Sequence, residues 1–188
     1  MPDNPLAHAA SEWRGLWPAV EALWPQLERF GEALLASWQA GGKLLTCGNG
    51  GSAADAIHFA EELVARFERN RRALPALALL DPGVLTCAAN DFGYEQVFAR
   101  QVEALGRPGD VLAVFTTSGN SPNVLRAVDA AEAGGLVTCA FLGRDGGRLK
   151  GRCRHELHVP APSAHRTQEA HVVLYHALCQ WLDSRVSP

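Results

Sequence analysis

Two groups of side chains in this sequence have the types and spacing that chemistry requires. The first is the segment TTSGNS at residues 116–121, which places four hydroxyl groups within six residues. Backbone N–H groups at the start of a helix, together with such hydroxyls, form a cradle for an anion that needs no lysine. We interpret Thr116, Thr117, Ser118 and Ser121 as a phosphate site, because an ordinary helix cap needs only one hydroxyl.

The second group combines imidazole and carboxylate side chains on two predicted helices. His58 and Glu62 are four residues apart and share one helical face, and Gln168 and His176 are eight apart on another helix. Two histidines, a glutamate and a glutamine can surround zinc or a similar divalent cation, although glutamine is a less common ligand. Two alternatives stay open: an acid–base pair of Glu62 and His176, or histidines that serve only the core or the surface.

A glycine-rich loop, GNGGSA, begins at residue 48. It matches neither the GxGxxG of dinucleotide-binding proteins nor the GK[ST] of nucleotide triphosphate sites, so we expect no nucleotide cofactor. Gly50 and Gly51 allow a ligand to approach the backbone, and Asn49 and Ser52 can donate hydrogen bonds to sugar hydroxyls or phosphate.

Three other polar residues are weaker candidates. Asn90 and Asp91 follow an apolar run and mark either a simple turn or a polar contribution to a sugar site. Arg66 belongs to an arginine cluster that is most simply a solvated helix end. It is the cluster member nearest to the His58 face, and therefore a possible phosphate partner.

Alternating strands and helices must position these groups. Apolar runs predict five strands, at residues 43–47, 74–80, 111–115, 136–142 and 156–159. Helices are expected at about residues 53–68, 122–133 and 165–183. This α/β alternation is typical of a parallel sheet covered on both faces, so we predict a three-layer αβα sandwich with a five-stranded parallel sheet. Both polar loops follow strands, at the carboxyl edge where open parallel sheets bind ligands.

The first forty residues are predicted to be an N-terminal helical extension. Apolar residues recur there at helical spacing, namely Leu16, Val20, Leu23, Leu27, Phe30, Leu34 and Trp38. We expect a helix to about Trp17, a kink or break at Pro18, and a second helix that ends at Gly41-Gly42. The chain is predicted to be a single domain, in which residues 1–41 form helices for subunit packing and residues 42–188 form the sandwich.

Composition narrows the class of protein. The chain has 188 residues and a formal net charge of -3, which gives no electrostatic reason to bind nucleic acid or a membrane surface. Its five cysteines include no CxxC pair and indicate reduced thiols in a cytoplasmic protein. We expect neither a signal peptide nor a membrane span.

Four segments carry a resemblance to a known family. They are, in order, GNGGSAADAIHFAEEL, AANDFGYEQVFARQVEALGRPGDVL, TTSGNSPNVLRAV and HRTQEAHVVLYH. Over residues 26–184 the chain resembles the sugar isomerase (SIS) domain, and more closely the bacterial phosphoheptose isomerases. The resemblance implies a flavodoxin-like fold and a homotetramer with active sites between subunits. It also implies conversion of sedoheptulose 7-phosphate to D-glycero-D-manno-heptose 7-phosphate, for the heptoses of lipopolysaccharide or other surface glycans.

The resemblance also implies roles for individual residues. Glu62 and His176 match the family's catalytic pair, and His58, Glu62, Gln168 and His176 match the ligands of one zinc ion per subunit. The residues that match substrate-binding positions are Asn49, Gly50, Gly51, Ser52, Arg66, Asn90, Asp91, Thr116, Thr117, Ser118, Ser121 and Gln168. One departure is His165, which stands where some relatives have an acidic residue.

Two rival interpretations are kept beside the isomerase. One is a non-catalytic SIS protein that binds the replication initiator, although such relatives have lost the catalytic glutamate and histidine. The other is an isomerase or a sensor for another sugar phosphate, because the sequence alone does not define the sugar.

Overall fold

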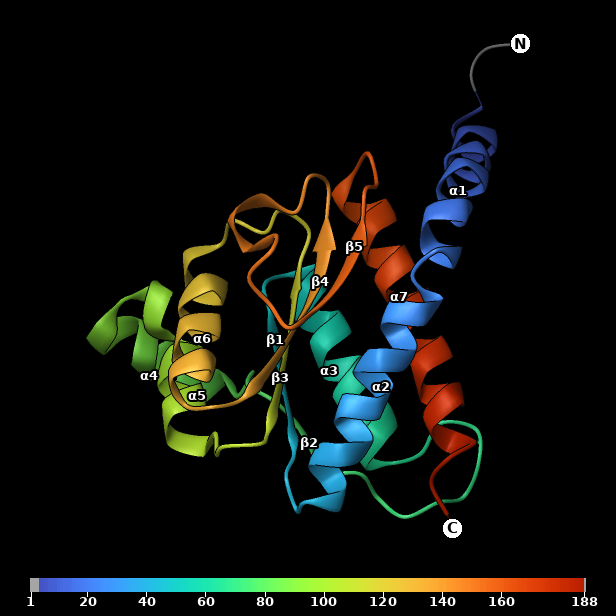
Figure 1. Ribbon diagram of the computed structural model, residues 1–188. Coiled ribbons are helices and arrows are strands. Elements are labelled where there is room, and N and C mark those ends of the chain that lie inside the picture. The colour runs from blue at the N-terminus through green and yellow to red at the C-terminus, as the bar shows by residue number, and fades with distance from the viewer. Residues whose placement is uncertain (1–3, 188) are drawn as a thin grey trace.

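The computed structural model describes residues 4–187, which form a parallel β-sheet between two layers of helices (Figure 1). The strands lie in the order β2-β1-β3-β4-β5, and every neighbouring pair is parallel. The strands are β1 (Leu44–Gly48), β2 (Ala76–Ala78), β3 (Val111–Thr116), β4 (Val137–Gly143) and β5 (His155–Val159). The predicted αβα sandwich with five parallel strands is therefore confirmed.

Five of the seven α-helices in the described chain, all but α3 and α5, begin where the sequence supplies a capping side chain or a proline. Asn4, Asp81 and Ser163 each accept a hydrogen bond from a backbone N–H of the first helical turn, at α1, α4 and α7 respectively. The α-helices are α1 (Pro5–Glu21), α2 (Trp24–Gln39), α3 (Gly51–Val64), α4 (Pro82–Phe92), α5 (Ala99–Leu105), α6 (Pro122–Ala133) and α7 (Ala164–Asp183). Short 3₁₀ turns occupy Tyr94–Gln96 and Gly147–Leu149.

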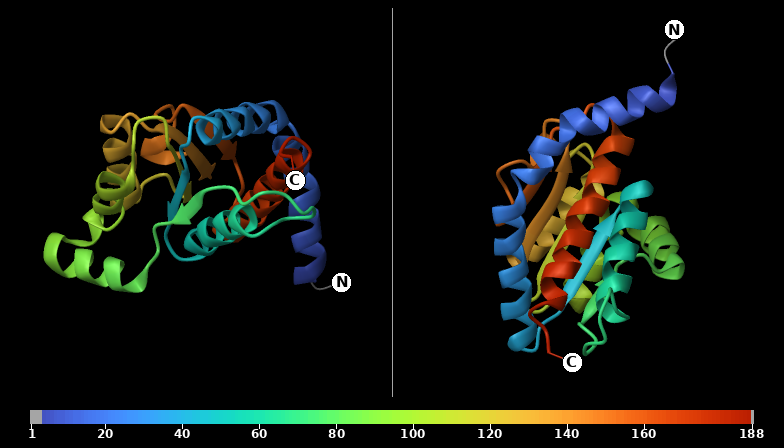
Figure 2. Two further views of the ribbon diagram at one scale, coloured as in Figure 1. Left: turned by 90° about the horizontal axis from the view of Figure 1, so that it is seen from below. Right: turned by 90° about the vertical axis from the view of Figure 1, so that its right-hand side faces the viewer.

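Successive residues of each strand face opposite sides of the sheet, and each side has its own hydrophobic core. In β1, Leu44 packs in the core that α2, α3 and α7 cover, whereas Leu45 packs in the core that α5 and α6 cover. Figure 2 shows these two helical layers on either side of the sheet. Each fully buried leucine or phenylalanine stabilises the fold by roughly 1.5–3 kcal/mol, so both layers are held firmly to the sheet.

A cluster of aromatic rings joins α3 and α7 to the middle of the sheet. Phe115 of β3 and Phe141 of β4 stack with ring centroids 4.3 Å apart. Above them, Phe59 of α3 and Tyr175 of α7 lie 5.6 Å apart between ring centroids. All four side chains are buried, and their contacts fix the distance between the two helices.

The break in the N-terminal helices lies at Ala22 and Leu23, not at Pro18 as predicted. α1 continues through Pro18, whose carbonyl still accepts from Ala22 N at 3.1 Å, although proline donates no backbone hydrogen bond and its ring crowds the preceding turn. Pro25 occupies the first turn of α2, as expected. α1 projects beyond the body of the sandwich (Figure 1), and the predicted apolar stripe from Leu16 to Trp38 is buried.

Two elements differ from the sequence predictions. The second strand is only Ala76–Ala78, because beyond it the run makes one backbone hydrogen bond to β1 on each side, Leu44 N to Pro75 O and Leu79 N to Thr46 O, and the ladder then stops. The segment after it forms the helix α4, which Asp81 caps, so Asn90 and Asp91 lie in a last helical turn and not in a loop. Within residues 4–187, no helix is long and apolar enough to cross a membrane.

His171 of α7 is a fully buried histidine at the centre of the aromatic cluster. Its ring centroid lies 6.0 Å from that of Phe115 and 5.7 Å from that of Phe141. Nε2 lies 3.3 Å from the carbonyl oxygen of Leu142. Burial lowers the pKa of His171 to about 4, so the folded protein keeps this imidazole neutral.

Substitution His171→Gln should remove one source of acid sensitivity. The folded-state pKa of about 4 lies below the ordinary 6.5, so the unfolded chain takes up a proton at this histidine before the folded protein does. The free energy of unfolding is therefore unaffected by this group above pH 6.5 and falls as the pH drops toward 4. Between pH 7 and pH 5, the wild-type free energy of unfolding should fall by roughly 2 kcal/mol more than that of the variant. Urea unfolding at both pH values measures the difference, and equal losses in both proteins would contradict it.

Candidate functional site

The hydroxyl-rich segment Thr116–Ser121, called here the hydroxyl loop, joins the end of β3 to the start of α6. Thr116 Oγ1 accepts a hydrogen bond from Gly119 N at 3.1 Å, and Ser118 Oγ accepts from Asn120 N at 3.2 Å. Gly119 has a φ of +63°, and a Cβ there would lie 1.9 Å from the carbonyl oxygen of Gly146. The loop is thus shaped by its own hydroxyls and by one position where only glycine fits.

A small pocket lies between the hydroxyl loop and the glycine-rich loop after β1. Its volume is about 80 Å³. It is lined by Asn49, Ser52, Phe115, Thr116, Thr117, Ser118, Ser121 and Gln168. The structure therefore places seven of the predicted substrate-binding residues around one cavity. Hydroxyls, amides and the N-terminus of α6 make this cavity suited to an anion such as phosphate.

The glycine-rich loop is held by side-chain amides. Asn49 and Asn123 exchange two hydrogen bonds of 2.9 and 2.8 Å, and Tyr94 donates its hydroxyl to Asn49 Oδ1 at 3.0 Å. A Cβ at Gly51 would lie 2.4 Å from Nε2 of Gln168, so the glycine leaves room for the end of the Gln168 side chain beside the start of α3.

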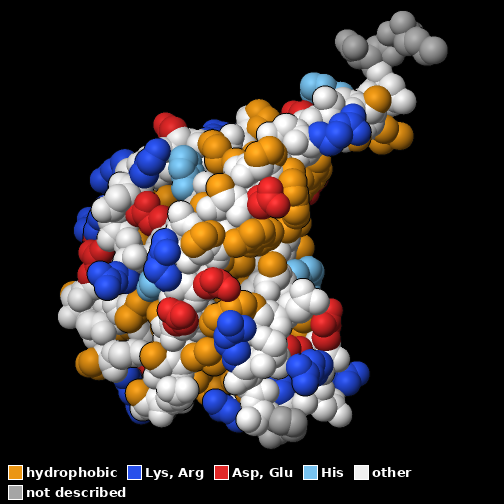
Figure 3. Space-filling view, turned by 45° about the vertical axis from the view of Figure 1, so that its right-hand side comes forward, with side chains coloured by type: hydrophobic (Ala, Val, Ile, Leu, Met, Phe, Trp, Pro, Cys, Tyr) orange, Lys and Arg blue, Asp and Glu red, His pale blue; other side chains and the backbone are white. Residues whose placement is uncertain are grey.

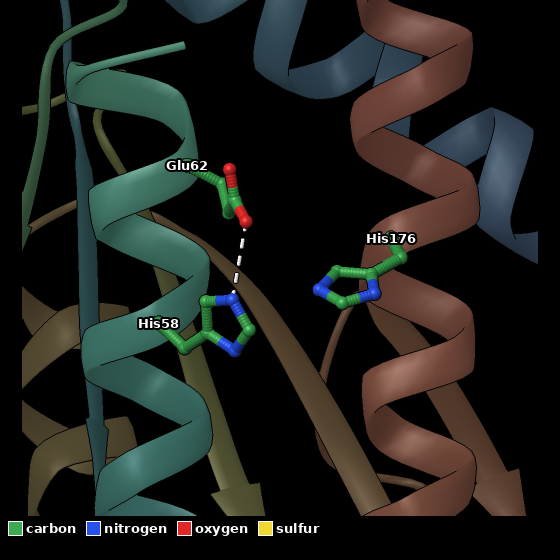
Figure 4. Close-up of side chains that lie close together, drawn as sticks. All are labelled: His58, Glu62 and His176. Atoms are coloured by element: carbon green, nitrogen blue, oxygen red, sulfur yellow. Dashed lines mark hydrogen bonds and ion pairs between the residues drawn. The ribbon is translucent and has the colours of Figure 1, made fainter. Parts of the chain in front are cut away.

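His58 and Glu62 of α3 point toward His176 of α7 (Figure 4). Nε2 of His58 lies 3.1 Å from Oε1 of Glu62, and the ring centroids of His58 and His176 are 5.0 Å apart. One nitrogen or oxygen atom from each residue lies within 4.8 Å of the other two. We call these three residues the triad; in residues 4–187 no other group of histidine, cysteine and carboxylate side chains has this spacing.

The triad fits a divalent cation. Two imidazole nitrogens and one carboxylate oxygen are a common donor set of catalytic zinc sites, which keep a further position open. Nε2 of His176 is buried and has no hydrogen-bond partner in the described part of the chain, a vacancy that a cation would fill. Burial and the neighbouring His58 lower the pKa of His176, against an opposing effect of Glu62, so its lone pair is free near neutral pH.

Two residues to which the sequence assigned no role lie beside the triad. Asp55 of α3 is buried one turn before His58, and burial raises its pKa to about 6, against an opposing effect of His58. Tyr175 of α7 places its hydroxyl oxygen 2.8 Å from Nδ1 of His58. In sequence, a tyrosine at an apolar helical position reads as a core residue, so this contact emerges only from the structure.

The remaining predicted residues have other partners. Arg66, exposed just beyond α3, donates to Oδ1 of Asn70 at 3.1 Å. Asn90 and Asp91 are exposed on α4, where Asn90 Nδ2 donates to Asp91 Oδ1 at 2.7 Å. Gln168 lines the pocket beside the hydroxyl loop, and its predicted role as a fourth metal ligand stays a prediction.

Comparison with known proteins identifies relatives over nearly the whole chain. Residues 10–143 match the model of the SIS domain family. A phosphoheptose isomerase from Paramagnetospirillum magneticum is 52% identical over 162 residues, which cover 86% of this chain and 84% of that protein. One from Thiobacillus denitrificans is 48% identical over 186 residues, or 97% of this chain and 94% of the other. The structure of the phosphoheptose isomerase from Neisseria gonorrhoeae superposes with a TM-score of 0.88 at 42% identity, covering 95% and 96% of the two chains.

Substitution Gly119→Ala should weaken anion binding at the hydroxyl loop. The new Cβ would collide with the carbonyl of Gly146 and displace the hydroxyls, which should lower the affinity for inorganic phosphate roughly 10-fold or more. Gly41→Ala is the matched control, since Gly41 also has a positive φ, of +83°, but open space around its Cβ position. Calorimetric titration with phosphate measures both, and wild-type affinity in Gly119→Ala would refute the assignment of the loop.

Proposed function

The chain belongs to the SIS domain family and, within it, to the phosphoheptose isomerases, and from this premise we propose its substrate and the roles of its residues. As an aldose–ketose isomerase, it converts sedoheptulose 7-phosphate to D-glycero-D-manno-heptose 7-phosphate through an enediol. The product would supply heptose for lipopolysaccharide or another surface glycan.

The placement of two sites on the same pair of helices is the observation that best supports this assignment. The same two helices, α3 and α7, carry an anion-binding pocket near their first turns and the triad further along. A sugar phosphate needs both features, one for the phosphate and one for the reacting carbons. The non-catalytic alternative is disfavoured, because Glu62 and His176 are both present and lie together.

The hydroxyl loop is assigned to the phosphate group. Thr117, Ser118 and Ser121, together with Ser52 and the N-terminus of α6, would hold the phosphate through neutral donors. Binding energy from this remote group then fixes the reacting carbons beside the triad, which reduces the entropic part of the barrier.

Glu62 and His176 are assigned to the two proton transfers of the isomerisation. Glu62 is the general base that moves the proton between C1 and C2, and His176 moves the proton between the two oxygens. Burial lowers the pKa of His176, so near pH 7 the imidazole is neutral and can accept a proton. A cation bound to Nε2 would use that lone pair, so His176 moves the proton only while Nε2 is free of the cation.

We assign one Zn²⁺ per subunit to His58, Glu62 and His176, with Gln168 as a possible fourth ligand. Bound there, the cation would polarise the carbonyl and stabilise the enediolate. Glu62 has two carboxylate oxygens, so it can hold a cation through one and exchange a proton through the other.

We also propose a homotetramer whose active sites lie between subunits. Hydrophobic side chains form a band along the face of α1, α2 and α7 (Figure 3), where Trp17 is 43% exposed. On this face, Trp24 and Trp181 border a groove of about 530 Å³. Apolar surfaces of this kind are typical of protein contacts. Residues 1–41 would then serve subunit packing, and Arg66 and Asp91 would contribute to the site of a neighbouring subunit.

A cytoplasmic location completes the proposal. Cys47, Cys139 and Cys179 are buried, and burial raises the pKa of each thiol, so these side chains stay protonated and behave as small apolar residues. Such thiols suit a reducing compartment.

The proposal predicts turnover of sedoheptulose 7-phosphate by the purified protein. NMR spectroscopy in D₂O should show aldose formation and deuterium incorporation at the carbon next to the carbonyl. A chelator should lower the rate, and added Zn²⁺ should restore it. A folded protein that gives neither product nor exchange would overturn the substrate assignment.

Substitution Glu62→Gln tests the carbon base. It should lower kcat by about 10²–10⁴-fold, because the amide cannot accept the proton, while binding of the sugar phosphate persists through the hydroxyl loop. Glu61→Gln is the control, since Glu61 is the neighbouring carboxylate but is exposed on α3. Steady-state rates and calorimetric binding of both variants decide the matter. Normal turnover by Glu62→Gln would exclude Glu62 as the base.

A further inference from the structure

The aromatic cluster holds two polar groups, the imidazole of His171 and the hydroxyl of Tyr175. The Tyr175 side chain is 1% exposed, and its ring packs against Phe59 and Phe115 at centroid distances of 5.6 and 6.1 Å. This packing aims the hydroxyl across the gap between α7 and α3, where it lies 2.8 Å from Nδ1 of His58. The hydroxyl is therefore held in place by the core and not by a mobile surface side chain.

The partners of the two ring nitrogens of His58 determine which of them carries the proton. Nε2 of His58 lies 3.1 Å from Oε1 of Glu62, and an ionised carboxylate can only accept a hydrogen bond. In the neutral imidazole, Nε2 therefore carries the hydrogen and Nδ1 accepts from the hydroxyl of Tyr175. If Nε2 instead donates its lone pair to a cation, Nδ1 must carry the hydrogen and donate to the Tyr175 oxygen.

A hydroxyl group is suited to both states because it donates and accepts equally well. Histidine ligands of metals generally donate their second ring N–H to a fixed acceptor, which sets the tautomer and the ring orientation. Tyr175 occupies that position for His58. It also directly precedes His176, so one turn of α7 provides a member of the triad and the support of another.

We infer that Tyr175 is a positioning residue, which holds the imidazole of His58 in the orientation that cation binding by the triad requires and accepts the Nδ1 hydrogen once Nε2 binds the cation. The inference rests on the proposed cation site of the isomerase. Tyr175 does not touch the reacting atoms in this assignment and acts through His58 alone.

The test compares Tyr175→Phe with Thr46→Val. Tyr175→Phe removes the hydroxyl and keeps the ring in the aromatic cluster. Thr46→Val removes another buried hydroxyl near α3, which donates to the carbonyl of Ala56 at 2.8 Å and has no contact with the triad. Each full-length protein is titrated with Zn²⁺ against a competing chelator, and the tautomer of His58 is read from ¹⁵N NMR of the imidazole.

We expect Tyr175→Phe to bind Zn²⁺ about 10–100-fold more weakly than the wild type, and Thr46→Val to bind within about twofold of it. In the metal-free wild type, the NMR spectrum should show hydrogen on Nε2 of His58, and added Zn²⁺ should move it to Nδ1. Metal-free Tyr175→Phe should keep the hydrogen on Nε2, because the contact with Glu62 remains, and only the partner of Nδ1 is lost.

Unchanged Zn²⁺ affinity in Tyr175→Phe would overturn the inference, as would failure of added Zn²⁺ to move the hydrogen of His58 to Nδ1 in the wild type. Equal weakening in Thr46→Val would also overturn it, by showing that the loss is merely structural. Failure of the proposed function looks different. The wild type could fail to turn over sedoheptulose 7-phosphate while the changes in Zn²⁺ affinity and tautomer still occur. In that case the role of Tyr175 is supported and only the substrate assignment is refuted.

Discussion

The packing of α3 against α7 over the sheet is the contact on which the rest of the site depends. Phe59 and Tyr175 meet above the stacked pair Phe115 and Phe141, and this buried cluster sets the separation of the two helices. Loss of a buried phenylalanine ring costs about 3–5 kcal/mol, a large share of the 5–15 kcal/mol that stabilises a typical domain. The core that stabilises the fold is thus the same structure that brings His176 to His58 and Glu62.

The direction of these two helices also explains the positions of the hydroxyl-loop pocket and of the triad. Both α3 and α7 start at the carboxyl edge of the parallel sheet, next to the loops that follow β1 and β3. Their first turns therefore supply Ser52 and Gln168 to the hydroxyl-loop pocket. Glu62 and His176 come two to three turns later on the same helices, so one pair of parallel helices connects anion binding to acid–base chemistry.

Much of this arrangement could be predicted from the sequence, because it depends on local patterns. Continuous apolar runs identified the buried strands, and the spacing of His58 and Glu62 placed them on one helical face. Residue spacing within each helix cannot show that α3 and α7 meet. That expectation came from the family resemblance. The helix break at Leu23 was missed because Pro18 is tolerated near the end of α1. The role of Tyr175 was hidden because an aromatic residue on an apolar face looks the same whether or not its hydroxyl has a partner.

In the proposed function, the hydroxyl loop would bind the part of the substrate that does not react. Ketose and aldose carry the same phosphate, so a grip on that group lowers the energy of both by equal amounts. The enzyme should accordingly suffer product inhibition, and free orthophosphate should compete for the same pocket of hydroxyls. Net flux would then depend on a later reaction that consumes the aldose, and a high phosphate concentration in the cell would slow the formation of the aldose.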